Sequence, residues 1–103
     1  MIVRRWQAPV IPTQEQIQSM LLAEGLKPLL EEFKPGQDLP VHTHPFDEVR
    51  MIIQGAMIIE MTGNRILLRA GDRIHIPSNT KHSKKIHGTE SCLSYYSPKV
   101  FIS

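Results

Sequence analysis

The sequence predicts an all-β fold, an antiparallel sandwich or barrel, with one short helix near the N-terminus. Short apolar-rich stretches of strand length recur along the chain after residue 25. Turn residues, chiefly glycine, proline and asparagine, separate these stretches from one another. Apolar residues at helical spacing occur in one segment only, and it precedes residue 25. Several short strands with a single helix are typical of an antiparallel β architecture.

The helix is expected to begin at Thr13. Thr13 and Gln16 have the spacing of a capping box, in which each side chain accepts a hydrogen bond from the backbone N–H of the other. Gly25 stands where a left-handed residue commonly ends a helix. We expect this helix to form a lid over one end of the core.

The expected strands are short and rich in apolar residues, and they cover residues 26–33, 48–53, 57–61, 65–68, 73–76 and 93–96. Gly63 and Asn64 lie between two of them and suit a tight hairpin turn. Pro40 and Pro45 bracket a pair of histidines and should keep that segment extended. The segment 2–7 is expected to be an N-terminal strand.

Length and composition narrow the class of protein. The 103 residues fit one domain, 1–103, with 1–25 as a lid or a dimer arm. A net charge of +2 is too weak to indicate a nucleic-acid partner. The single cysteine, Cys92, excludes an internal disulfide and is expected to be a small core residue. No signal-peptide core or membrane-spanning apolar run occurs, so we expect a cytoplasmic protein without a membrane partner.

Three histidines and a glutamate form a candidate metal site. His42 and His44 lie two residues apart in an extended segment, so they project from the same face. Glu48 follows at an even offset, and His82 could add a third nitrogen from a different strand. Imidazole nitrogen and carboxylate oxygen suit borderline divalent metals. The alternative is a set of surface histidines on a polar loop; His75 and His87 lack this context and are treated as ordinary histidines.

The segment around the first two histidines resembles the first sequence motif of the cupin superfamily. The residues that match the motif are Gly36, His42, His44, Glu48 and Gly55, at the family spacing. The match to this motif is complete.

A later segment is similar to the second cupin motif. Gly71, Pro77 and His82 stand at the family spacing. Asn79 replaces a usual glycine, which is a mild change because asparagine tolerates left-handed backbone. Ile86 replaces a usual asparagine, and no metal ligand is lost with it.

The resemblance implies a jelly-roll β-barrel (a double-stranded β-helix) with a metal inside, near one mouth. In the family the positions that match His42, His44, Glu48 and His82 are the ligands, and water or substrate takes the remaining coordination positions. The implied cofactor is one divalent transition metal, and Fe, Mn, Zn, Ni and Co all remain open.

Strand parity adds two candidate substrate-binding residues. If Glu48 faces the interior, Arg50 shares its face, and if His82 does, Lys84 does too. A buried cation needs an anion, so Arg50 is a candidate anchor for an anionic group of a small substrate. The alternative is that Arg50 reaches the rim or pairs internally with Glu60 or Asp47.

Two classes of function remain open. The favoured one is a metal-dependent enzyme, of dioxygenase, isomerase or decarboxylase type, acting on a small polar or anionic metabolite. The other is a non-catalytic module that binds or senses a metal or small ligand; the ion could also serve mainly to stabilise the barrel. No catalytic residue is assigned, although Tyr95, Tyr96 or Glu60 could serve as acid or base.

A homodimer is expected from the strand that begins at Glu48. Val49, Met51 and Ile53 make its outward face as apolar as its inward face, and both faces should therefore be covered. We expect the N-terminal strand to pair with or pack on the neighbouring subunit.

Overall fold

The computed structural model describes residues 2–99 and contains one helix and nine strands in that range. The elements in chain order are β1 (Ile2–Arg4), α1 (Gln14–Ala23), β2 (Leu29–Phe33), β3 (Leu39–His42), β4 (Asp47–Gln54), β5 (Ala56–Met61), β6 (Asn64–Arg69), β7 (Arg73–Ile76), β8 (His82–His87) and β9 (Cys92–Lys99). The predicted all-β fold with one short N-terminal helix is confirmed. No helix in residues 2–99 is both long and apolar enough to cross a membrane.

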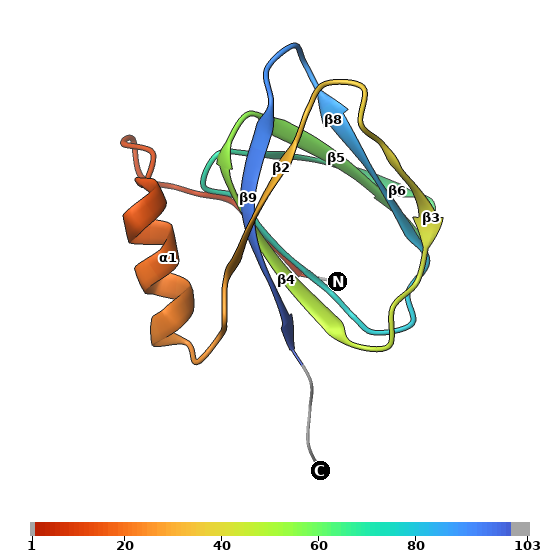
Figure 1. Ribbon diagram of the computed structural model, residues 1–103, viewed down its shortest axis with the longest axis horizontal. Coiled ribbons are helices and arrows are strands. Elements are labelled where there is room, and N and C mark those ends of the chain that lie inside the picture. Colours follow the sequence, from red (N-terminus) through yellow and green to blue (C-terminus); the bar gives the residue numbers. More distant parts are fainter. Residues whose placement is uncertain (1, 100–103) are drawn as a thin grey trace.

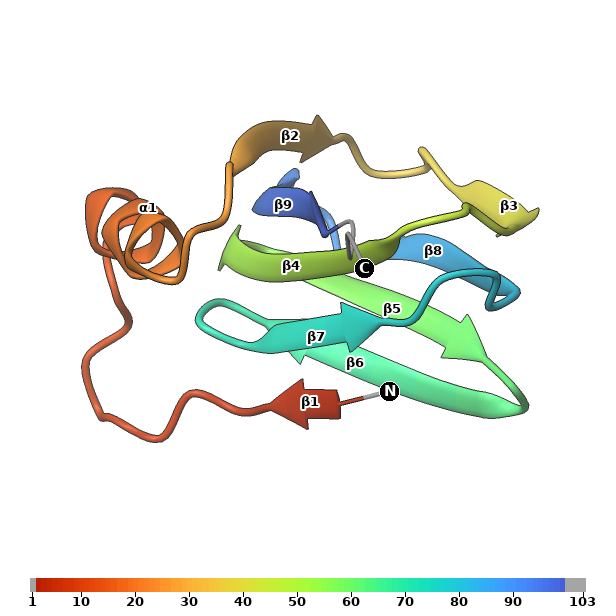
Figure 2. The ribbon, with the colours of Figure 1, turned by 90° about the horizontal axis from the view of Figure 1, so that it is seen from below.

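The strands form two antiparallel sheets in a jelly-roll arrangement. The five-stranded sheet has the order β1-β7-β4-β9-β2, and the four-stranded sheet has the order β3-β8-β5-β6. From β2 to β9 the chain passes from one sheet to the other at every connection except the β5–β6 hairpin (Figures 1 and 2). This alternation brings β4 and β8, which are far apart in the sequence, to facing positions across the interior.

The main apolar core lies between the two sheets. Its fully buried members come from both sheets and include Ile52, Met57, Ile59, Leu68 and Ile74. Cys92 is buried in the same cluster, as expected of a core residue. Burial raises the pKa of its thiol to about 11, which keeps it protonated and unreactive at neutral pH.

Helix α1 begins as predicted but lies in a different place. Thr13 and Gln16 form both hydrogen bonds of the capping box, and Gly25 follows the helix with φ of 81°. The buried face of α1, Ile17 and Leu21, packs against β4 and β9 (Figure 1). The helix therefore covers the outer face of the five-stranded sheet rather than one end of the core.

The position of α1 bears on the expected dimer. Val49 and Met51, on the outward face of β4, are buried in the same cluster as Ile17 and Leu21. The second apolar face of β4 is thus covered within the chain and does not require a second copy. The N-terminal strand β1 likewise pairs with β7 of its own chain, at Val3 opposite Ile74.

Some local expectations need correction. Strands β3 and β8 were not among the expected strands. The β5–β6 turn is centred on Thr62 and Gly63, both with positive φ, and not on Gly63 and Asn64. A two-residue turn with positive φ at both centres matches the twist of a hairpin, and Asn64 already pairs with Met61. Asn79 has φ of 58°, which agrees with the tolerance expected of asparagine there.

Candidate metal centre

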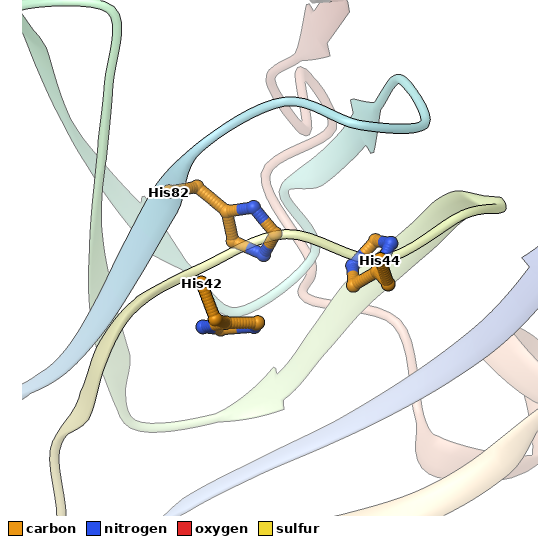
Figure 3. A group of neighbouring side chains, drawn as sticks. All are labelled: His42, His44 and His82. Atoms are coloured by element: carbon orange, nitrogen blue, oxygen red, sulfur yellow. The ribbon is translucent and has the colours of Figure 1, made fainter.

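Two neighbouring strands bring the three candidate histidines together. His42, at the end of β3, is directly opposite His82, at the start of β8, in the antiparallel ladder between them. His44 follows β3 on the way to β4 and shares the face of His42. The ring centroid of His82 lies 4.3 Å from that of His42 and 5.0 Å from that of His44. One nitrogen of each ring lies within 4.8 Å of the others, around a common space (Figure 3).

Backbone carbonyls fix the orientation of all three rings. The Nδ1 atoms of His42, His44 and His82 each lie 2.8 Å from a carbonyl oxygen two residues away in the chain. A carbonyl oxygen only accepts, so each Nδ1 carries the proton and donates it. In the neutral form of such a ring the lone pair is on Nε2, which is the arrangement of histidines that bind a metal.

The histidine nitrogens fit a metal ion in a second respect. The Nε2 atoms of His44 and His82 are buried and make no hydrogen bond within residues 2–99. A buried acceptor without a partner is costly unless a further group meets it. Burial lowers the pKa of His82, and nearby Lys84 and His42 lower it further, so the ring is neutral and able to bind a cation.

Glu48 lies at the edge of this cluster. Its Oε1 is 3.3 Å from Nε2 of His44, but it is also 3.1 Å from Nζ of Lys84. Its Oε2 accepts a hydrogen bond of 2.9 Å from Nε of Arg50. Burial opposes ionisation of Glu48, but Arg50 and Lys84 outweigh it and lower its pKa to about 2. Glu48 is therefore an ionised carboxylate that lies beside the histidines and is paired with two buried cations, Arg50 and Lys84.

Arg50 and Lys84 both face the interior, as strand parity predicts. Their side chains are 2% and 3% exposed. Arg50 pairs internally with Glu48 and, through Nη2, with Glu31 at 2.7 Å. These are not the partners considered from the sequence, Glu60 and Asp47. Nη1 of Arg50 donates to Ser94, and the guanidinium lies 4.9 Å from the ring centroid of Tyr96.

Glu31 and Ser94 belong to this network but were not candidates from the sequence, and Glu31 is the charged one of the two. It lies on β2 opposite Ser94 of β9 and shares its strand face with Phe33, which is buried in the core. Parity with Phe33 was the available signal, and it would have placed Glu31 in the interior.

The loop before β8 is tied to the segment that carries His44. The backbone N–H of Asn79 donates to the carbonyl of His44 at 2.7 Å. Asp47 accepts from the backbone N–H of Ser78 at 2.9 Å and pairs with Nε2 of His75 at 2.7 Å. These bonds hold His44 and His82 in register, and they place His75 outside the cluster.

The remaining candidates lie away from the three rings. His87, at the far end of β8, lines a hollow of about 1020 Å³ with Trp6 and Arg69. Glu60 is exposed and near Arg65, and Tyr95 packs beneath α1, where its hydroxyl accepts a hydrogen bond from Gln14. Tyr96 alone of the possible acid–base residues borders the interior charges.

Comparison with known proteins supports the fold. A solved cupin-2 domain containing protein from Shewanella frigidimarina is 25% identical, with a TM-score of 0.57 over 68% of this chain and 67% of that chain. A conserved protein of unknown function from Streptococcus pyogenes is 19% identical, with a TM-score of 0.60 over 71% of this chain and 63% of that chain.

A DMSP lyase from Ruegeria pomeroyi is 21% identical, with a TM-score of 0.63 over 72% of this chain and 38% of that chain. The chain thus spans less than two thirds of the length of this protein and of the streptococcal one. No curated protein sequence matches the chain. Residues 29–96, more than half of the chain, match the family model described as the cupin domain. With its two facing antiparallel sheets and its histidine cluster between β3 and β8, the chain belongs to the cupin domain family.

Proposed function

We propose that this cupin binds one divalent transition metal through Nε2 of His42, His44 and His82, with Glu48 as the fourth ligand. The fixed orientation of the three rings carries the proposal. Each Nδ1 is committed to a carbonyl, and each Nε2 is left as an acceptor beside the other two. A chance cluster of surface histidines would not need a hydrogen bond from Nδ1 to a backbone carbonyl at all three positions.

Glu48 completes this set because of its distance from His44. The 3.3 Å between Oε1 and Nε2 of His44 suits two donors that share one ion. Three nitrogens and one oxygen are compatible with Fe, Mn, Zn, Ni and Co. An ion held by four protein ligands keeps coordination positions for a substrate when its geometry is five- or six-coordinate.

We further propose that the site acts on a small polar or anionic metabolite. A bound divalent ion would supply Lewis-acid or redox chemistry there, of dioxygenase, isomerase or decarboxylase type. Arg50 and Lys84 face this interior, where Glu31 and Glu48 balance their charges, so the bound ion itself would supply the positive charge that attracts an anionic metabolite. The DMSP lyase from Ruegeria pomeroyi has a similar fold. A shared fold does not assign a reaction, so the proposed chemistry rests on the residues of the site.

A non-catalytic binding module is the second candidate. The interior beside the histidines is already filled by Arg50, Lys84, Glu31 and Tyr96, which pair with or pack on one another. A cavity filled by side chains favours holding an ion or a very small ligand over processing a larger substrate.

Metal analysis of three proteins tests the metal site. Wild type, His82→Ala and His87→Ala are purified without chelator, and their transition-metal content is measured by elemental analysis. We expect one ion per chain in wild type and in His87→Ala. The metal content of His82→Ala should be at least tenfold lower, because His82 is a proposed ligand and His87 is not. Equal metal in all three proteins would contradict the site.

Activity assays on the loaded protein separate the two candidate functions. Oxygen uptake and product analysis are followed with small carboxylic acids and catechols as substrates. The enzyme proposal expects turnover in wild type and His87→Ala that is lost in His82→Ala. Metal binding without any turnover would favour the binding module.

A further inference from the structure

A hollow of about 1020 Å³ lies at the end of the barrel opposite the histidine cluster. His82 and His87 stand at opposite ends of β8, and His87 is the one of the two that lines this hollow. The walls come from the segment between β1 and α1, which runs along the outside of the barrel (Figure 2), from the four-stranded sheet and from the β8–β9 turn. A hollow of this size accommodates a small molecule.

The floor of the hollow is a row of three residues from adjacent strands. Ala56 of β5 pairs with Arg69 of β6 on one side and with His87 of β8 on the other. Residues directly opposite each other in antiparallel strands project from the same side of a sheet. The neighbours Met57 and Leu68 point into the core, so this row points outward. Strands β6 and β8 are about 10 Å apart, and the methyl group of Ala56 leaves the space between Arg69 and His87 open.

Arg69 and His87 line the hollow without a partner for their side chains. Within residues 2–99 neither side chain forms an ion pair or a hydrogen bond. Arg5 also lines the hollow, but it is paired with Asp72 at 2.8 Å. Arg69 is therefore the arginine of this hollow that is free to bind an anion. Glu90 lines the hollow from the β8–β9 turn, and its charge disfavours a ligand with more than one negative charge.

Trp6 gives the hollow an aromatic wall that is held in place. Its backbone N–H donates to Oδ1 of Asp72 at 3.0 Å, and its Nε1 donates to the carbonyl of Val10 at 2.9 Å. Its side chain lies against Gly71. A flat ring packs favourably on an indole, and an indole that is already fixed loses little freedom when a ligand arrives.

We propose that this hollow binds a small aryl carboxylate, with the carboxylate between Arg69 and His87 and the ring beside Trp6. The guanidinium of Arg69 donates two parallel hydrogen bonds to the carboxylate, and a ring N–H of His87 donates a further one. A single carboxylate, rather than a doubly charged phosphate, matches the one unpaired arginine. The site shares no residue with the proposed metal centre and does not depend on the proposed function.

Titration of wild type with benzoate tests the ligand class. Trp6 is the one tryptophan of the chain, so its fluorescence reports on a ligand that reaches this wall. Benzamide is the neutral isostere of benzoate, and acetate is a carboxylate without a ring. We expect a saturable change with benzoate, and binding at least about fivefold weaker for benzamide and for acetate. Equal binding of benzamide and benzoate, or no change with benzoate, would overturn the proposal.

The same titration in EDTA separates this hollow from the metal centre. A carboxylate can also coordinate a bound ion, but benzoate between Arg69 and His87 needs none. The dissociation constant of benzoate should therefore be unchanged by EDTA. Benzoate binding that EDTA abolishes would place the ligand on the metal and overturn the proposal.

Variants of the floor locate the benzoate, since Trp6 also lines a smaller hollow with Met20. Arg69→Met should weaken benzoate binding about fivefold. Arg65→Met is the matched control and should change it less than about 1.5-fold, because Arg65 lies on the same exposed face of β6 but outside the hollow. Equal effects of these two substitutions would overturn the site.

A third variant should act in the opposite direction. Glu90→Gln removes a negative charge from the lining, so we expect benzoate to bind about twofold more tightly. Weaker binding in Glu90→Gln would contradict an anionic ligand at this place. Arg65, Arg69 and Glu90 are all exposed, so the three variants should keep the melting temperature of wild type.

Discussion

At the scale of single residues, Asp72 fastens the N-terminal segment to the barrel. Its Oδ1 accepts from the backbone N–H of Trp6 at 3.0 Å, and its Oδ2 pairs with Arg5 at 2.8 Å and accepts from the N–H of Arg69 at 2.9 Å. Trp6 in turn covers Gly71, where an added Cβ would lie 2.7 Å from the Cβ of Trp6. Gly71 thus serves a close approach as well as a turn.

Asp72 also predicts an acid-dependent loss of stability. Burial opposes its ionisation, but hydrogen bonds from Arg69, Trp6 and Arg5 prevail and lower its pKa below 3.8. A lowered folded-state pKa stabilises the fold above pH 3.8, and this contribution is lost as the pH falls through the folded-state value.

Replacement of Asp72 isolates this contribution. We expect Asp72→Asn to lower the free energy of unfolding by about 1–3 kcal/mol at pH 7, measured by urea denaturation. The difference from wild type should shrink as the pH is lowered below 3.8. Asp38→Asn, at an exposed position, is the control and should change little. A constant difference across the pH range would show that the charge of Asp72 is not what matters.

The residue scale also shows how far the site could be predicted. His42, His44 and His82 come together as parity and motif spacing indicated, and Glu48 lies beside them. The ion pairs of Arg50 could not be assigned, because they depend on which strands are neighbours. Glu31 and Ser94 reach Arg50 only through the order β4-β9-β2, which residue spacing does not reveal.

At the scale of elements, the two strands missed from the sequence, β3 and β8, are those that carry His42 and His82. In β8 the inward residues are His82, Lys84 and the partly buried Ile86, while the outward ones are also polar. A strand that faces a polar interior on one side and solvent on the other has no apolar alternation to detect. Strand β3, with Pro40 in it, is hidden in the same way.

Helix α1 was predictable as an element but not in its position. Its capping box and its glycine stop are local signals, whereas its packing partner is set by an apolar face of β4 that a second copy could equally have covered. Leu21 and Leu22 provide a matched test, since the first is 0% and the second 55% exposed.

We expect Leu21→Ala to lower the free energy of unfolding by about 2–4 kcal/mol, because it leaves a cavity between α1 and β4. Leu22→Ala should change it by less than about 0.5 kcal/mol. Urea denaturation with fluorescence detection measures both. Equal effects of the two substitutions would mean that α1 does not pack on the sheet in solution.

At the scale of the whole molecule, the edges of the five-stranded sheet are the places where a second copy could pair. Val49 and Met51 are covered by α1, and among the exposed apolar side chains that remain, two adjacent ones lie on strand β2. This strand forms one edge of the sheet, and Leu29 and Leu30 are 49% and 52% exposed. Edge strands with exposed apolar side chains pair readily with another chain.

We therefore retain the homodimer as a prediction and place its contact at β2, where a second copy would cover Leu30. Wild type should be a dimer at micromolar concentration by multi-angle light scattering. Leu30→Lys should weaken the dimer at least about tenfold, because a desolvated ammonium costs more than the 1.4 kcal/mol that this factor represents.

Leu22→Lys, on the solvent face of α1, should remain dimeric and shows whether added charge alone has an effect. A monomeric wild type would contradict the dimer, and a dimeric Leu30→Lys would move the contact to another edge. Metal content should be unchanged in both variants, because β2 supplies none of the proposed ligands.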